Sequence, residues 1–170
     1  MLEYNIKNIV LDPVFFSKSG DSLIKDDALV ILKEKLIPIC DVITPNIYEA
    51  ESLSGFSIHN VEDMKRASEI LYSLGSRAII IKGGHLHGDA VDVLYNGKEF
   101  RIIKNKRILG KNPHGTGCTF SSALAVGLAL DLSIDEAFKG AKEYVTGAIK
   151  RSIAVGSGFN VLNHIYKFSG

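Results

Sequence analysis

The sequence predicts an α/β fold around a mainly parallel β-sheet, because short apolar runs alternate with longer helical patterns. The runs NIVLD, DVIT and AIIIK, at residues 8–12, 41–44 and 78–82, have the length and composition of strands buried on both faces. Between them, residues 26–37 and 60–74 carry apolar side chains at helical spacing. Strands that alternate with helices in this way are typical of parallel strands joined by crossover helices.

Polar residues and a glycine indicate where these two helices begin and end. Asp26 and Asn60 occupy positions where a short polar side chain caps the first backbone amides of a helix. Gly75 stands just after the second helical pattern, where a glycine commonly ends a helix. We therefore expect Asp26 and Asn60 to be the N-caps and Gly75 to be the stop.

The next segment has the pattern of a β-hairpin. Residues 90–95 (AVDVLY) and 98–103 (KEFRII) alternate between apolar and polar side chains, with Asn96 and Gly97 between them. An Asn-Gly pair favours a two-residue turn between antiparallel strands. We expect this hairpin at one edge of the sheet.

Two further helices are expected in the last third of the sequence. Residues 114–130 (HGTGCTFSSALAVGLAL) open with two glycines and continue as an apolar helix of small residues. Residues 133–152 form a second long helical pattern, in which Ser133 and Glu136 have the spacing of a capping box.

Length, charge and cysteine content narrow the functional class. A chain of 170 residues suits one domain, residues 1–170. Its 20 basic and 19 acidic residues are interspersed, so we expect a small-molecule partner and no nucleic acid.

The two cysteines, Cys40 and Cys118, form no disulfide framework, and Cys40 fits core packing. No leader or membrane-spanning run is recognisable, so we expect a cytoplasmic protein that contacts no membrane.

The first apolar run raises a question about the width of the sheet. It begins within ten residues of Met1, yet its composition predicts a strand in the middle of a sheet. Three such strands and one hairpin make a narrow sheet for two layers of helices. We therefore expect a second copy of the chain or a missing segment to complete it.

Residues with phosphate- and metal-binding chemistry follow the predicted strands. Asp12 ends the first strand, Asn46 and Glu49 follow the second, and Lys82 ends the third beside two glycines. The carboxyl ends of parallel strands meet at one edge of a sheet, where open α/β folds bind their ligands. Carboxylates suit Mg²⁺ and a lysine suits phosphate, so the set favours a nucleotide polyphosphate with Mg²⁺.

The glycine-rich helix start, Gly115-Thr116-Gly117-Cys118, would add an anion site. Gly115 and Gly117 permit positive φ and close approach of a ligand, so that the first free amides of the helix point into one cavity. The helix dipole favours a bound anion there and also favours the thiolate of Cys118. Such a thiolate would be able to take a proton from a substrate hydroxyl.

Each of these residues also has a purely structural interpretation. The glycine-rich stretch alone fits a tight turn with a packed thiol, and Asp12 before a proline fits a strand terminator. Asn46 and Glu49 fit a helix N-cap with its capping-box partner. Lys82 fits a solvated lysine at a strand end.

Several stretches, taken in order, form a more specific combination than any one of them. They are LDPV with KSG (residues 11–14 and 18–20), ITPNIYEAESLSG (43–55), IIKGGHL (80–86), HGTGCTFSSALA (114–125) and KEYVTGAI (142–149). In this order and spacing the chain resembles the hydroxymethylpyrimidine/phosphomethylpyrimidine kinases, the thiamine-pathway members of the ribokinase-like family. The resemblance implies a three-layer α/β/α fold with a mainly parallel central sheet, here without its N-terminal strands.

The resemblance also implies an activity. Such kinases use ATP and Mg²⁺ to phosphorylate the hydroxymethyl group of 4-amino-5-hydroxymethyl-2-methylpyrimidine and then its monophosphate. By motif match, the turn of Gly115, Thr116 and Gly117 supplies the anion hole, and Cys118 is the general base.

The same match assigns the residues at the strand ends. Asp12 and Glu49 correspond to the acids near Mg²⁺ and phosphate. Asn46 and Lys82 correspond to groups that contact the nucleotide phosphates.

The chain departs from the family pattern in several places. Pro113 stands where the family usually has threonine, and Asn160 and Val161 stand where it has glycine and proline. The family also carries about a hundred residues before the LDPV strand, which hold the lid and most of the pyrimidine pocket. Residues 2–8 (LEYNIKN) would then be the tail of a crossover helix.

These departures leave three interpretations open. The first is the C-terminal part of such a kinase, from a truncated gene product or gene model. The second is a non-catalytic nucleotide-binding remnant or assembly partner, and the third is a related pyridoxal-type kinase.

Overall fold

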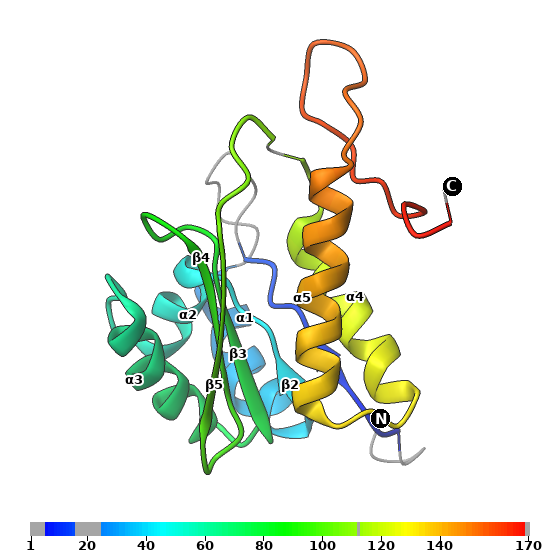
Figure 1. Ribbon diagram of the computed structural model, residues 1–170. Helices are drawn as coiled ribbons and strands as arrows, with labels where there is room; N and C mark the ends of the chain where they lie inside the picture. Colours follow the sequence, from blue (N-terminus) through cyan, green and yellow to red (C-terminus); the bar gives the residue numbers. More distant parts are fainter. Residues whose placement is uncertain (1–5, 16–24, 112, 169–170) are drawn as a thin grey trace. The chain divides into compact units, whose positions relative to one another are not determined.

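A computed structural model of the protein describes residues 6–15, 25–111 and 113–168. The chain forms two compact units, Met1–Asn105 and Lys106–Gly170. The first unit holds a β-sheet with its helices, and the second holds the last two long helices (Figure 1). The KSG motif at residues 18–20 lies outside the described residues.

In the described part of the first unit, five strands form one sheet and lie side by side in chain order (Figure 1). The strands are β1 (Val10–Leu11), β2 (Val42–Ile43), β3 (Ala78–Gly83), β4 (Ala90–Tyr95) and β5 (Phe100–Asn105). The pairs β1–β2 and β2–β3 are parallel, whereas β3–β4 and β4–β5 are antiparallel. The predicted α/β class is confirmed, with the three parallel strands on one side and the hairpin at the opposite edge.

The first strand is shorter than predicted, and its predicted place in the middle of a sheet stays a prediction. Within the described residues β1 lies at the edge of the sheet and is half-buried, because β2 alone pairs with it. It begins at Val10, since Asn8 has a φ of 60°, a left-handed conformation that does not belong to a strand. The helix tail predicted for residues 2–8 is not seen at residues 6–8, which are irregular, and residues 2–5 lie outside the described range.

The first helical region is less regular than its apolar pattern predicts. It consists of α1 (Asp26–Ile31), a π-helical turn (Leu32–Leu36) and a 3₁₀ turn (Ile37–Ile39). The prediction of Asp26 as the N-cap is wrong by one residue, because Lys25 holds the extended backbone (φ −86°, ψ 162°) and Asp26 is already helical. Pro38, which has no amide hydrogen to donate, lies in the last of these turns.

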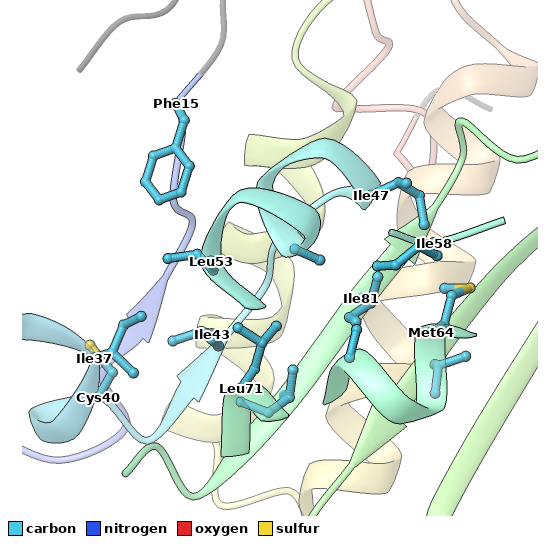
Figure 2. Packing of buried hydrophobic residues seen from close by; sticks show 14 residues of the cluster. Phe15, Ile37, Cys40, Ile43, Ile47, Leu53, Ile58, Met64, Leu71 and Ile81 are labelled. Atoms are coloured by element: carbon cyan, nitrogen blue, oxygen red, sulfur yellow. The ribbon is translucent and has the colours of Figure 1, made fainter. Parts of the chain in front are cut away.

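Helices α2 (Ile47–Ser54) and α3 (Val61–Tyr72) pack against the sheet and enclose the main core, part of which Figure 2 shows. Met64 and Leu71 of α3 and Ile81 of β3 are each 0% exposed. Burial of an apolar side chain of this size contributes about 1.5–3 kcal/mol. The core therefore holds β2 and β3 firmly at the positions from which the candidate site residues extend.

The boundaries of α3 agree with the sequence pattern. Asn60 is its N-cap, and the Asn60 side chain accepts a hydrogen bond of 3.0 Å from the Asp63 amide. Gly75 follows the end of this helix with a φ of 108°, which suits a glycine.

The predicted hairpin forms, but its turn is longer than the sequence suggests. Because β4 ends at Tyr95 and β5 begins at Phe100, four residues connect the strands instead of two. The Asn96 side-chain oxygen accepts hydrogen bonds of 3.0 Å from the amides of both Lys98 and Glu99. Asn96 thus organises a wider loop through its side chain.

The second unit contains α4 (Thr116–Ala129) and α5 (Ile134–Lys150), close to the predicted ranges. The rings of Phe120 and Phe138 meet edge-to-face between these helices, with centroids 6.2 Å apart. Ser133 and Glu136 form the predicted capping box at the start of α5. None of the described helices is long and apolar enough to cross a membrane.

Candidate functional site

The carboxyl ends of the parallel strands converge on an ion pair. Asp12 follows β1 and Lys82 lies near the end of β3, and the Lys82 Nζ atom is 2.6 Å from Asp12 Oδ1. The side chains of Lys82 and Asp12 are only 14% and 16% exposed. The two groups meet as the strand order predicts, and the alternative of a solvated Lys82 is wrong.

The segment after β2 contacts both residues of this ion pair. The Lys82 amide donates a hydrogen bond of 2.8 Å to the Pro45 carbonyl, and Lys82 forms a parallel bridge with Asn46. Thr44 is fully buried, and its hydroxyl lies 3.5 Å from Asp12 Oδ1. Thr44 was predicted as part of a strand and not as a site residue, and its position at the carboxyl end of that strand is the signal that points to the site.

Asn46 and Glu49 form a capping box at the start of α2. The Asn46 side-chain oxygen accepts from the Glu49 amide at 3.0 Å, and Glu49 Oε2 accepts from the Asn46 amide at 2.7 Å. Glu49 is 3% exposed, and this burial raises the pKa of its carboxyl above the ordinary value. The Asn46 hydrogen bond and the Lys82 charge lower that pKa in part, whereas the Asp12 charge raises it. The structural interpretation of this pair is confirmed, and the box also holds a buried carboxyl within electrostatic reach of Asp12 and Lys82.

The chemistry of this group fits a metal–phosphate ligand better than a bare metal ion. Asp12 and Glu49 offer two carboxyl groups, and Lys82 offers one positive charge. In the part of the chain that the structure describes, no three His, Cys, Asp or Glu side chains gather in a metal-binding cluster. Mg²⁺ in nucleotide-binding sites usually takes one or two carboxylates and completes its coordination with phosphate and water. The residues present suit that mode of binding.

In the second unit, the glycine-rich stretch forms the start of α4. Gly115 is the N-cap with a φ of 81°, and no side chain among the described residues caps this helix end. Thr116 is the first helical residue, and Gly117 lies within the first turn. The prediction of positive φ is therefore confirmed for Gly115 and wrong for Gly117, because the helix begins one residue earlier than Gly117.

The two cysteines differ in their surroundings. Cys118 is the third residue of α4 and is exposed, so the alternative of a packed thiol is wrong. Cys40 is 3% exposed, donates its thiol hydrogen to the Leu36 carbonyl at 3.1 Å, and has its pKa raised by burial to about 11. Cys118 is thus an exposed cysteine in the first turn of a helix, whereas Cys40 is a buried one.

The predicted site residues thus fall into two groups. Asp12, Asn46, Glu49 and Lys82 come together in the first unit, and the turn from Gly115 to Cys118 belongs to the second. A single site that contains both groups stays a prediction.

Val161, which stands where the family pattern has proline, closes a loop in the C-terminal part of the chain. Ile153 and Val161 exchange two backbone hydrogen bonds of 2.9 and 2.8 Å, one of which is donated by the Val161 amide. A proline at this position would have no amide hydrogen for that bond. Within the loop, the Phe159 ring meets the His114 ring at a centroid distance of 4.2 Å. The loop therefore lies against the residue that precedes the glycine-rich turn.

Comparison with known proteins gives a consistent result. A family model for phosphomethylpyrimidine kinase matches residues 1–163. The hydroxymethylpyrimidine/phosphomethylpyrimidine kinase of Aquifex aeolicus is 46% identical over 156 residues, which cover 91% of this chain and 61% of that protein.

Two solved structures share the fold. An ADP complex of pyridoxal kinase from Bacillus subtilis superimposes with a TM-score of 0.88 and 35% identity, over 99% of this chain and 63% of that one. The phosphomethylpyrimidine kinase of Clostridium difficile superimposes with a TM-score of 0.75 and 45% identity, over 87% of this chain and 60% of that one. The chain therefore spans about 60% of the length of these relatives. Together with the predicted ribokinase-like fold, which these structures confirm, the match shows that the chain belongs to the phosphomethylpyrimidine kinase family.

Proposed function

We propose that the protein uses ATP and Mg²⁺ to phosphorylate 4-amino-5-hydroxymethyl-2-methylpyrimidine and then its monophosphate, in thiamine biosynthesis. Family membership supports this activity. The ion pair of Lys82 and Asp12 beside the buried Glu49 carries the proposal, because phosphate- and Mg²⁺-binding groups gather there at the strand ends. The ADP complex of the pyridoxal kinase supports ATP as the donor.

The residues of the first unit have proposed roles in holding the nucleotide. Lys82 binds a phosphate oxygen. Asn46 is held next to Lys82 by the parallel backbone bridge between the two residues. Asp12 and Glu49 hold Mg²⁺, directly or through its waters. Bound Mg²⁺ would neutralise phosphate charge and favour the ionised form of Glu49.

The residues of the second unit have proposed roles in the transfer step. The Cys118 thiolate takes the proton of the substrate hydroxyl while the hydroxyl oxygen forms a bond to the terminal phosphorus and ADP departs. The amides of Gly115, Thr116 and Gly117 stabilise the charge on the transferred phosphoryl group.

We further propose that residues 1–170 act as one cytoplasmic domain that needs a second copy or a separate segment to complete the acceptor pocket. The span of about 60% of the relatives supports this proposal. So does the position of β1, which has one strand neighbour among the described residues and is flanked by the exposed apolar side chains of Ile6 and Val14.

A pyridoxal-type kinase is the second candidate, which the similarity to the Bacillus subtilis pyridoxal kinase favours. A non-catalytic nucleotide-binding protein is the third, which the partial coverage of the relatives favours.

A kinase assay with Mg-ATP and either the pyrimidine alcohol or pyridoxal separates these candidates, with products identified by mass spectrometry. We expect the pyrimidine to be phosphorylated faster than pyridoxal, and Lys82→Met to lose activity. Lys98→Ala, a change of an exposed lysine in the hairpin loop, is the matched control and should behave as wild type. Faster phosphorylation of pyridoxal would favour the second candidate, and nucleotide binding with no transfer would favour the third.

A further inference from the structure

Asp92 is a buried acidic residue that the proposed mechanism does not use. It lies in β4 and is 3% exposed. Its Oδ1 atom accepts a hydrogen bond of 3.0 Å from the amide of Gly83, the residue that follows Lys82. Burial of a carboxyl group is costly unless hydrogen-bond partners replace the lost water, so the partner of Asp92 indicates what this acid does.

The register of the sheet places Asp92 directly opposite Lys82. The two residues are cross-strand partners in the β3–β4 pairing, so their side chains emerge on the same face of the sheet. Lys82 therefore has acids on both sides, Asp92 on β4 and Asp12 after β1. The Lys82 side chain extends past β2, so that its Nζ atom lies 2.6 Å from Asp12 Oδ1. The Gly83 amide donates its hydrogen bond to Asp92.

The close approach of β3 and β4 explains why the peptide between Lys82 and Gly83 needs the Asp92 carboxyl group as a hydrogen-bond acceptor. A Cβ atom on Gly83 would overlap the carbonyl oxygen of Val91 and would crowd the side chain of Met64. Residue 83 is thereby restricted to glycine, whose backbone has the widest conformational freedom of any residue. The Asp92 carboxyl group restrains that freedom directly after Lys82.

We propose that Asp92 is a positioning residue for Lys82, an inference that rests on the proposed role of Lys82 in binding nucleotide phosphate. By holding the Gly83 amide, Asp92 fixes the peptide that follows Lys82. The Lys82 side chain is then directed across β2 to the site beside Asp12.

Three variants of the full chain test this role. Asp92→Ala removes the acceptor, whereas Asp92→Asn keeps an oxygen that accepts the Gly83 hydrogen bond. Asp41→Ala is the matched control, because Asp41 also accepts a backbone amide, that of Ile9 at 2.9 Å, but lies before β2 at the opposite ends of the strands. If Asp92→Ala does not fold, Asp92→Val takes its place, since valine suits a strand and has no acceptor.

The direct measurement is NMR of the Gly83 amide and of the Lys82 side chain. In Asp92→Ala we expect hydrogen exchange at Gly83 to become about tenfold faster or more, because the hydrogen bond that protects this amide is lost. The Lys82 Nζ resonance should also shift. Asp92→Asn and Asp41→Ala should change neither. Unchanged Gly83 exchange and an unchanged Lys82 resonance in Asp92→Ala would overturn the proposal, whether or not the protein binds nucleotide.

The functional measurement is a calorimetric double-mutant cycle with Mg-ADP as the probe. We expect Asp92→Ala to weaken binding about tenfold, and to cause no further loss when added to Lys82→Met, since it acts through Lys82. Equal weakening in both backgrounds would overturn the positioning role. Failure of the wild-type protein to bind Mg-ADP would instead count against the proposed function, and the NMR result would then decide the role of Asp92.

Discussion

The Asp12–Lys82 ion pair should contribute measurably to stability, unlike most ion pairs at protein surfaces. The two charged atoms lie 2.6 Å apart in side chains that are 16% and 14% exposed. With an effective dielectric constant of about 20, their attraction is about 6 kcal/mol, and loss of hydration offsets most of it. We expect a net coupling of about 1–2 kcal/mol, between the values typical of exposed and of buried pairs.

A double-mutant cycle of Asp12→Asn and Lys82→Met measures this coupling, with urea unfolding followed by circular dichroism at pH 7. The ion pair of Glu62 and Lys65 on α3 is the control, because its atoms are 2.8 Å apart but its side chains are 72% and 27% exposed. Its coupling should be about 0.5 kcal/mol or less. Equal coupling energies in the two cycles would refute the argument that burial strengthens the Asp12–Lys82 pair.

Further predictions concern Glu49, Gly83 and Cys118. Because burial raises the pKa of Glu49 in the folded state, the folded protein holds that proton more tightly, and stability should fall as pH rises through and above the ordinary glutamate range. Urea unfolding between acid and neutral pH should show this slope reduced in Glu49→Gln, and an identical slope in both proteins would contradict it. Gly83→Ala should lower the free energy of unfolding by about 2 kcal/mol or more through overlap with Val91, whereas Gly84→Ala, where a Cβ meets open space, should be nearly neutral. Equal losses in the two variants would count against the close approach. Where phosphoryl transfer is detected, Cys118→Ala should lower kcat by about two to four orders of magnitude, and near-normal turnover would remove Cys118 from the base role.

The sequence allows the strand ends of the first unit to be predicted because parallel strands have few ways to assemble. Apolar runs identify the strands, and the chain direction then brings Asp12 and Lys82 to the same edge. The capping box of Asn46 and Glu49 is also local in sequence, so its spacing suffices to predict it.

Other features depend on tertiary contacts that a local pattern does not contain. Asp26 and Lys25 are both able to begin a helix, and the backbone conformation of Lys25 decides between them. The hairpin turn widens because the Asn96 side chain binds two amides of the loop. Thr44 and Asp92 are recognised as site residues only in the folded structure. Strand pairing brings Thr44 to Asp12 and Asp92 to the peptide after Lys82.

The apolar composition of β1 predicts a place in the middle of a sheet, and that place stays a prediction. Composition reports how much burial a strand favours, whereas the described chain provides β1 with a neighbour on one side alone. The proposal that a second copy or another segment completes the sheet would reconcile the two observations.

Calorimetric titration of the protein with Mg-ADP tests the central claim most directly, that the Asp12–Lys82 site holds a nucleotide phosphate. The wild-type protein and Lys98→Ala should bind with the same affinity, and Lys82→Met should bind at least about tenfold more weakly, since a charge-assisted phosphate contact is lost. Equal affinity of Lys82→Met and wild type, or no binding by the wild-type protein, would contradict it.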